Sequence, residues 1–417
     1  MIQIANIFLR GITLASKFLL IFFLAKFLDP VEVGIYGLIA ATTGYALYVV
    51  GFEFYNFSNR EMIGEDPRHW LRIIRDQTVL YLILYALFLP FGMLLFLKGW
   101  LPWKYISWFF GLVLFEHVAQ ELNRILVAIS HQLLASFVLF LRSGAWCLIV
   151  AFAMWLSPEA RNLDFMFGAW TICACFACAL AVIKLLSFDN KCLRAPIDWV
   201  WIKSGIKVAL PLLAASLAVR GMFTFDRYFV ENITSLDVLG PYVLFIGIAT
   251  AILSFLDAGV IVFFYPKLVS FAKAEDYYGF KKCVKGLTLN IVVVTFILAF
   301  ICFLISEPLL RLLDKPLYIE NLFLLYWLLI GVIIYALSTI PHLGLYSFGK
   351  DKPIFLSQVV GFFVFLAVSY CGGNYWGVII IPWAMCLAFS VILVWKLISY
   401  HLMRINQKSL EIHLVLE

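Results

Sequence analysis

The sequence predicts an all-α polytopic membrane protein with twelve transmembrane helices in two six-helix bundles. Three observations support this fold class. Of the 417 residues, 64% are hydrophobic and only 13% are charged, whereas soluble domains contain about 45–50% apolar and about 25% charged residues. Apolar stretches of about 18 residues or more, long enough to cross a bilayer, recur along the whole chain. Sequence patterns of the first half also recur in the second half.

A transmembrane helix needs about 20 apolar residues, and the chain offers twelve such stretches between short polar connections. In chain order, the predicted spans are 6–28, 34–57, 76–97, 104–128, 132–156, 165–187, 205–229, 236–263, 286–306, 321–346, 353–371 and 375–400. The predicted organisation is an N-terminal six-helix lobe at 1–190, a cytoplasmic linker at 191–204 and a C-terminal six-helix lobe at 205–417. No soluble domain is expected.

Lysine and arginine are concentrated in one set of alternate loops and in the C-terminal tail. Because basic loops stay on the cytoplasmic side of a membrane, both termini are predicted to be cytoplasmic. The opposite set of loops holds only Lys26, Lys98, Lys104, Arg161, Arg311 and Lys315. The net charge of +6 therefore reflects topology, and no nucleic-acid partner is indicated.

The stretch DPVEVGIYGLI separates the first two spans and has the features of a helix start. Asp29 is expected to be the N-cap, Pro30 the first helical residue and Glu32 the third residue of a capping box. Thr234 and Asp237 are expected to repeat this box before the eighth span. The prediction is a sharp turn at the outer surface that begins a helix.

Two loops suggest an internal repeat. EDPRHWLRIIRDQTVL, which starts at Glu65, resembles EDYYGFKKCVKGLTLN, which starts at Glu275, at an offset of 210 residues. An offset of 206 residues aligns Gly34 with Gly240. With six helices per repeat, both halves enter the membrane from the same side, as in transporters with parallel repeats. Such proteins work by alternating access to a cleft between the halves.

Charged residues remain inside the predicted spans, where each basic residue costs about 2.5–3.5 kcal/mol unless it has a partner, water or a role. The basic ones are Arg10, Lys17, Arg124, Arg142, Arg220 and Arg227, and the acidic ones are Glu53, Glu116, Glu121, Asp226 and Asp257. From their depth at about 1.5 Å per residue, Arg142 and Glu116 are expected to lie at the same level and to pair. Glu121 and Arg124 are expected to pair along one helix face, and Asp226 is expected to reach water near the outer surface.

Lys17 and Arg220 lie near mid-membrane on the first helix of each half, with no acid near them in sequence. Arg10 and Lys17 are seven residues apart and therefore share a face of their helix. This pattern predicts a cationic cavity for an anionic substrate, since arginine grips phosphate bidentately and lysine acts as a point charge. The candidate substrate-binding residues are Arg10, Lys17, Arg220 and Arg142, and the candidate ion-coupling residues are Glu116, Asp257 and Glu53.

Catalytic and metal-binding residues are not predicted. No nucleophile motif, phosphate loop or metal cluster is found in the sequence. Cys173, Cys175 and Cys178 lie on one apolar helix without acids or histidines around them and are interpreted as packing residues. His117, beside Glu116, is expected to hydrogen-bond to a neighbouring helix. A transporter without a bound cofactor, and with coupling to an H⁺ or Na⁺ gradient, is therefore favoured over an enzyme.

The charged first helix, the segment LAKFLDPVEVGIYGLI, the basic loop after it and the half-length repeat resemble the polysaccharide flippases of the multidrug/oligosaccharidyl-lipid/polysaccharide (MOP) exporter superfamily. The nearest group is the Wzx-type O-antigen flippases, and the motif that carries the resemblance is Pro30, Glu32, Gly34 and Tyr36. The resemblance implies a V-shaped, MATE-like pair of lobes around a cavity. It also implies transfer of an undecaprenyl-diphosphate-linked oligosaccharide from the inner to the outer leaflet of a bacterial inner membrane.

By the same resemblance, basic residues of the first and seventh helices engage the diphosphate or acidic sugars. The expected partners are this lipid-linked glycan, membrane lipids, and the polymerase and chain-length proteins of the same pathway. Two alternatives stay open. One is a cation-coupled small-molecule or multidrug exporter of the same fold. The other is a membrane-embedded polysaccharide polymerase or ligase, although the outward loops are short for an active site.

Overall fold

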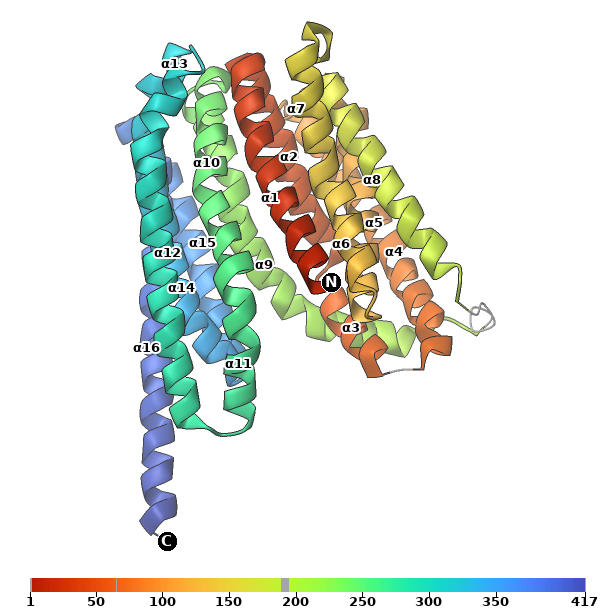
Figure 1. The fold of residues 1–417 in the computed structure, drawn as a ribbon, viewed down its shortest axis with the longest axis vertical. Helices are drawn as coiled ribbons and strands as arrows, with labels where there is room; N and C mark the ends of the chain where they lie inside the picture. The colour runs from red at the N-terminus through yellow and green to blue at the C-terminus, as the bar shows by residue number, and fades with distance from the viewer. Residues whose placement is uncertain (1, 65, 189–194, 417) are drawn as a thin grey trace. The chain divides into compact units, whose positions relative to one another are not determined.

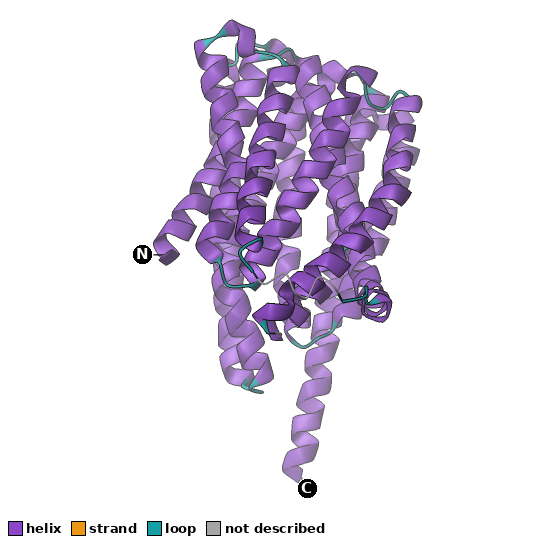
Figure 2. Cartoon of the chain, turned by 90° about the vertical axis from the view of Figure 1, so that its right-hand side faces the viewer, coloured by secondary structure: helices purple, strands orange, loops and turns teal. Residues whose placement is uncertain are grey.

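The computed structural model describes residues 2–64, 66–188 and 195–416, and every element in this part of the chain is helical (Figure 2). Glu65 and residues 191–194 of the predicted linker lie outside the described residues. The chain divides into two compact units, Met1–Arg220 and Gly221–Glu417. Figure 1 shows the helices of both.

The first unit holds the helices α1 (Ile2–Phe27), α2 (Pro30–Gly51), α3 (Tyr55–Gly64), α4 (Trp70–Leu97), α5 (Ile106–Ala128), α6 (Gln132–Phe140), α7 (Trp146–Leu156), α8 (Leu163–Leu185) and the first part of α9 (Trp199–Ile233). A π-helical turn, η3 (Leu141–Ala145), joins α6 to α7. Short 3-10 turns, η1 (Pro67–His69), η2 (Trp103–Tyr105) and η4 (Pro158–Ala160), precede α4, α5 and α8.

The second unit holds the rest of α9 and the helices α10 (Leu236–Leu256), α11 (Val262–Lys273), α12 (Tyr277–Arg311), α13 (Pro316–Glu320), α14 (Leu322–Ser347), α15 (Asp351–Trp376) and α16 (Ile380–Leu416). A second π turn, η6 (Asp257–Ile261), joins α10 to α11, and the 3-10 turn η7 (Gly377–Ile379) joins α15 to α16.

Ten described segments are long and apolar enough to cross a membrane. One of them, Asp351–Ile405, contains both α15 and α16. The helix α5 is not among the ten, and its acidic and amide side chains, such as Glu116 and Glu121, explain its lower hydropathy. With α5 included and α15 and α16 counted separately, the described residues form twelve long helical segments. The predicted fold class, an all-helical polytopic membrane protein, is confirmed.

Several predicted helix ends are wrong for identifiable reasons. The second span was predicted to reach residue 57, but α2 ends at Gly51 because Phe52 and Glu53 adopt left-handed backbone angles (φ 54° and 55°). The eleventh span was predicted to end at residue 371. Instead α15 continues to Trp376. Gly372 does not end the helix, because it packs against Ile380 too closely for a side chain and is therefore a packing residue.

The predicted start of α2 is confirmed. Pro30 is the first helical residue, Asp29 is the N-cap with extended backbone, and its N–H donates to the Glu32 carboxylate over 3.4 Å. The predicted box before α10 is wrong. Thr234 donates from its backbone N–H and its hydroxyl to Val230 and so ends α9, which leaves Ser235 as the N-cap of α10. Both helices then place a glycine and a tyrosine at the same distances from their caps.

Contacts within each unit support the predicted repeat. In the first unit, α5 packs against α2 and α8, and in the second unit α14 packs against α10 and α16. The Cys178 thiol of α8 lies 3.4 Å from the carbonyl oxygen of Phe115 on α5. The Cys386 thiol of α16 lies 3.4 Å from the carbonyl oxygen of Trp327 on α14. The same contact therefore occurs at corresponding places in both units.

The two loops of the repeat also begin alike. The Asp66 carboxylate accepts from the backbone N–H of Arg68 over 2.9 Å, and that of Asp276 accepts from the backbone N–H of Gly279 over 2.8 Å. The hydrogen bond from the Arg68 backbone lowers the pKa of the Asp66 carboxyl. In each unit an aspartate therefore satisfies an N–H group at the start of a helix.

The first part of α9 is fixed to the first unit by contacts near its N-terminus. Trp201 packs edge-on against Phe54 at 5.3 Å, and Gly205 lies too close to Phe54 for any side chain. Arg72 pairs with Asp198 at 3.2 Å, and Arg75 donates to the carbonyls of residues 195 and 196. These contacts hold the segment of α9 that leads to Arg220.

We predict that the crossing of α15 and α16 is sensitive to side-chain volume. A β-carbon on Gly361 would lie 2.6 Å from Ile392 and 3.3 Å from the Ala388 carbonyl oxygen. Gly361→Leu should therefore destabilise the protein by roughly 1–3 kcal/mol or more, because the core is overpacked. The measurement is thermal unfolding of the purified protein in detergent.

Gly111→Leu is the matched control, because no atom lies within 4 Å of a β-carbon at that position. It should leave the unfolding temperature nearly unchanged. Equal losses for the two variants would contradict the packing described for α15 and α16.

Candidate functional site: a charged cluster in the first unit

The helix α1 packs closely on the π turn η3 through small residues. Thr13 and Ser16 lie buried on this face of α1, and their hydroxyls donate to carbonyls of their own helix. A β-carbon on Gly144 would lie 3.0 Å from the Thr13 α-carbon and 3.1 Å from the Ser16 hydroxyl. Only glycine permits this approach without a shift of neighbouring atoms. The close approach brings α1 next to Arg142, which lies in the same π turn.

Arg142 forms an ion pair with Glu116 of α5, as predicted from their depths. Its Nη1 lies 3.1 Å from Glu116 Oε2 and also donates to Gln120 Oε1 over 3.1 Å. Both charged side chains are almost fully buried, with exposures of 13% and 6%. Removing such a pair from water is costly, and it is repaid only when further hydrogen bonds satisfy the remaining polar atoms.

The second oxygen of Glu116 is satisfied by an indole. Trp170 of α8 donates from Nε1 to Glu116 Oε1 over 2.6 Å. Its ring stacks on Trp146, with centroids 4.7 Å apart and planes inclined by 9°. The residues Glu116, Gln120, Arg142, Trp146 and Trp170 thus form one connected group, which we call the Glu116 cluster.

Lys17 lies beside the Glu116 cluster. The charges of Arg142, Glu116 and Arg220 all act on its ammonium group, and its side chain is exposed. Among the described residues, nothing forms a hydrogen bond or ion pair with this ammonium. The three cations outweigh the single carboxylate, so this part of the first unit is positive overall.

Arg220 lies at the end of the first unit and is exposed. Its guanidinium group lies over the ring of Tyr48 on α2, 5.0 Å from the ring centroid. A cation over an aromatic face gains about 0.5–1 kcal/mol at an exposed site. The contact with Tyr48 therefore restrains the orientation of the planar guanidinium group. Lys17, Arg142 and Arg220 therefore lie near one another within the first unit, while the cationic cavity stays a prediction.

The other predicted site residues do not join this cluster. Arg10 is exposed and forms no hydrogen bond or ion pair with a described residue. Glu53 is buried in the left-handed turn after α2, where its carboxylate accepts from Asn56 over 2.6 Å. This bond serves the local turn. Asp257 is exposed in the second unit, at the first position of the π turn η6.

Two predicted site residues, Arg142 and Asp257, lie in π-helical turns. Such turns are rare and occur frequently at functional sites, because they add a residue and change the direction of the side chains that follow. No sequence pattern marked them in advance. The π turns are an independent structural reason to treat Arg142 and Asp257 as candidates.

A second polar network in the first unit is fully internal. Glu121 pairs with Arg124 at 2.5 Å, as predicted, and accepts from Tyr81 over 2.6 Å and from Gln77 over 3.1 Å. His117, also as predicted, bonds across helices, with its Nδ1 2.7 Å from the Tyr85 hydroxyl on α4. These partners link α4 to α5 and indicate a structural role.

The expectation that Asp226 reaches water is wrong. Its side chain is fully buried, pairs with Arg227 at 3.1 Å and accepts from the Tyr242 hydroxyl over 2.8 Å. The position of Asp226 along its span does not reveal that α10 covers this face of α9.

Gln120, Trp146 and Trp170 were not predicted as site residues. Gln120 could have been found, because it lies four residues after Glu116 and hence on the same face of α5. The two tryptophans come from other helices, and a single sequence does not reveal which indoles meet a given carboxylate.

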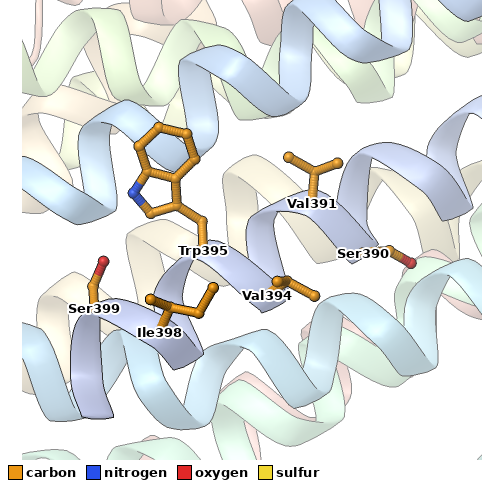
Figure 3. A pocket seen from close by; sticks show the side chains of 6 residues that line it. All are labelled: Ser390, Val391, Val394, Trp395, Ile398 and Ser399. Atoms are coloured by element: carbon orange, nitrogen blue, oxygen red, sulfur yellow. The ribbon is translucent and has the colours of Figure 1, made fainter. Parts of the chain in front are cut away.

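A separate groove of ≈ 410 Å³ lies along one face of α16 (Figure 3). Its lining is mainly apolar and consists of Ser390, Val391, Val394, Trp395, Ile398 and Ser399. None of the predicted site residues lines it.

The fold and the charged cluster define a polytopic, all-helical membrane protein with buried ion pairs between its helices and a positive region in its first unit. No family model and no curated protein sequence matches the chain. Solved structures do match it, and they give it a MATE-like fold.

The chain superposes on the inward-facing conformation of a multidrug resistance MATE family transporter of the MOP superfamily with a TM-score of 0.77 at 12% identity, covering 96% of this chain and 98% of that one. It matches the outward-facing conformation of a transporter of the same description with a TM-score of 0.59 at 12% identity, covering 97% and 94%. It matches a mutant of the Vibrio cholerae MATE transporter VcmN with a TM-score of 0.60 at 12% identity, covering 98% and 95%. Identity this low establishes the fold alone, because one fold hosts many functions.

We predict that the Glu116–Arg142 pair is essential for stability as a pair. Glu116→Ala or Arg142→Ala should each cost about 3–5 kcal/mol, because the remaining charge is buried without a partner. The double change Glu116→Leu with Arg142→Met should cost less than the sum of the single changes. Thermal unfolding in detergent, analysed as a double-mutant cycle, measures this coupling.

The exposed pair Glu307–Arg311, at 2.6 Å on α12, is the matched control. Alanine at either position should have little effect, since water screens surface pairs. A coupling between Glu116 and Arg142 no larger than that of the control would contradict the interpretation.

Proposed function

We propose that this protein is a flippase that moves an undecaprenyl-diphosphate-linked oligosaccharide, such as an O-antigen repeat unit, from the cytoplasmic to the periplasmic leaflet of a bacterial inner membrane. The observation that carries this proposal is the excess positive charge around Lys17. Glu116 is already paired with Arg142 and bonded to Trp170. The exposed charge of Lys17 therefore remains for an anionic ligand, and the guanidinium of Arg220 adds to the positive charge around it.

The chemistry of the two residues suits a diphosphate. The ammonium of Lys17 provides a compact charge, and the guanidinium of Arg220 provides two parallel donors for phosphate oxygens. Arg142 contributes its charge from the buried side, while its hydrogen bonds to Glu116 and Gln120 are already made. Arg10, two turns before Lys17 on α1, is proposed to meet the ligand nearer the cytoplasmic surface.

The proposal includes the topology and the partners. Both termini are proposed to be cytoplasmic, the lobes to alternate in access, and the substrate to arrive from enzymes that assemble lipid-linked sugars. The polymerase and chain-length proteins of the same pathway are the proposed downstream partners. The MATE-like fold supports transport by a non-enzyme, since alternating access is the working principle of repeat transporters.

A second candidate function is a cation-coupled exporter of small molecules. It is favoured by the matched inward-facing and outward-facing structures of a multidrug resistance MATE family transporter, and by the buried carboxylate of Glu116. In that case the carboxylates would be essential and the cations dispensable.

We predict that the gene restores surface polysaccharide in cells that lack their own flippase and make the matching repeat unit. The Lys17→Ala, Arg220→Ala double variant should lose this activity by tenfold or more. Hydrogen bonds to charged groups contribute about 1.5–3 kcal/mol each, and about 1.4 kcal/mol corresponds to tenfold. Surface polysaccharide is quantified on gels and by antibody, relative to the amount of flippase in the membrane.

Lys98→Ala with Arg311→Ala is the control, because both side chains are exposed and neither belongs to the Glu116 cluster. It should retain full activity. Unchanged activity in the Lys17, Arg220 double variant would overturn the anion site. If, in addition, Glu116→Gln or Asp257→Asn abolished transport, the exporter would be the better assignment.

A further inference from the structure

The second unit contains a buried lysine that has no carboxylate partner among the described residues. Lys396 lies in the last predicted span, 375–400, and its side chain is only 2% exposed, inside α16. Its Nζ lies 3.1 Å from Nδ1 of His342 on α14. The two residues join helices that pack along each other within the second unit.

Among the described residues, the surroundings of this pair contain other titratable groups but no acid. On α14, the His342 ring stacks on Tyr346 at 6.4 Å, and Tyr265 of α11 packs on Tyr346 at 5.8 Å. On α16 itself, Tyr400 follows one turn later, with the Arg404 guanidinium 6.0 Å from its ring centroid.

From α15, which packs against the same stretch of α16, no charged side chain acts on the pair. Within the described residues, burial is the main influence on the protonation of both groups. Among these residues, the one charge that acts on His342 is that of Lys396, and no charge acts on Lys396. In contrast, the buried arginines Arg124, Arg142 and Arg227 each have a carboxylate within hydrogen-bonding distance.

This arrangement limits how many protons the pair can hold. A second proton would put two positive charges about 3 Å apart in a medium of low dielectric, where their repulsion is large. With one proton, the ammonium donates to Nδ1 and the charge is shared across a single hydrogen bond. Without a proton, the amine and the neutral imidazole keep that bond and no charge is buried. When two groups are coupled this strongly, each titration step belongs to the pair and not to either residue.

We propose that His342 and Lys396 form a proton-binding site in the second unit, and that loading and unloading of this one proton couples transport to a proton gradient. The buried charge has no counterion in the described part of the chain, so its free energy depends strongly on how much water reaches it. Any conformational change that opens or closes α14 against α16 therefore changes the affinity of the site for its proton. That dependence is the physical requirement for coupling.

The groove on α16 is lined by sequence neighbours of Lys396 but not by Lys396 or His342. Ser399, which lines the groove, lies three residues after Lys396 and hence on the neighbouring side of the helix. Trp395, the residue before Lys396, lines the groove as well (Figure 3). The candidate ion-coupling residues from the sequence are the carboxylates Glu116, Asp257 and Glu53. The His342–Lys396 pair adds a basic candidate to these acidic ones.

Proton binding is tested without any substrate, on the full-length purified protein in lipid nanodiscs. The probe is the proton itself, followed through the ¹⁵N resonances of labelled histidines between about pH 5 and 9. His342→Gln assigns the signal of His342. In the wild-type protein, Nδ1 of His342 should have the shift of a hydrogen-bond acceptor and should move in one titration step.

Lys396→Met should abolish that step and move the Nδ1 signal to that of an imidazole without the lysine. Lys396→Arg should keep the acceptor signal and abolish the titration, because arginine stays charged. Lys267→Arg, an exposed position in the same unit, is the control and should leave the wild-type titration unchanged. A His342 signal that is independent of pH, or that is the same in wild type and Lys396→Met, would overturn the proton site.

The coupling part of the proposal rests on the proposed function and is tested in the complemented cells. Lys396→Arg should lower surface polysaccharide tenfold or more at equal protein level, because the site can no longer release a proton. Full activity of this variant, with the wild-type titration present in the nanodisc experiment, would overturn the coupling and leave the proton site. If the wild-type gene failed to complement, the flippase assignment would fall while the nanodisc result would stand.

Discussion

The carboxylate of Glu116 is the interaction on which the site in the first unit depends. One oxygen binds Arg142 from the π turn, and the other accepts from Trp170 on α8. Three elements are therefore held by one group. A hydrocarbon environment offers no water to replace either bond, so both must form together or the charges are not tolerated. Because Arg142 is paired in this way, the proposed anion site depends on the charge of Lys17 beside the cluster.

The two units repeat their helix contacts but not their charges. The matching contacts of Cys178 and Cys386 align Phe115 with Trp327, so Leu328 and Leu329 follow where Glu116 and His117 do in the first unit. The second unit places its buried charges elsewhere, on α9 as the Asp226–Arg227 pair and on α16 as Lys396. The two similar units therefore carry the Glu116 cluster, with Lys17 beside it, in one half and a different kind of charged site in the other.

Much of the fold could be predicted from the sequence, because hydropathy, loop charge and capping are local properties. The start of α2 at Pro30 and the pairing of Arg142 with Glu116 followed from spacing and depth alone. The error at Thr234 is local, because its N–H and hydroxyl bond to Val230 and end α9. The error at Asp226 depends on which neighbouring helix covers a given face, since a side chain near a helix end looks solvent-accessible until a second helix is placed against it. The Trp170 contact was beyond reach for the same reason.

The π turn at Leu141–Ala145 makes the charge arrangement depend on chain length as well as on residue type. A π turn contains one residue more than an α-helical turn, and one residue corresponds to about 100° of rotation. The widened turn sets where Arg142 lies against Glu116 and where Gly144 lies against α1. Loss of a single residue between Arg142 and Trp146 would let the turn close to regular helical geometry and would change that placement, although every side chain of the cluster were still present in the sequence. A one-residue deletion in this turn is thus expected to be as damaging as the loss of a charge.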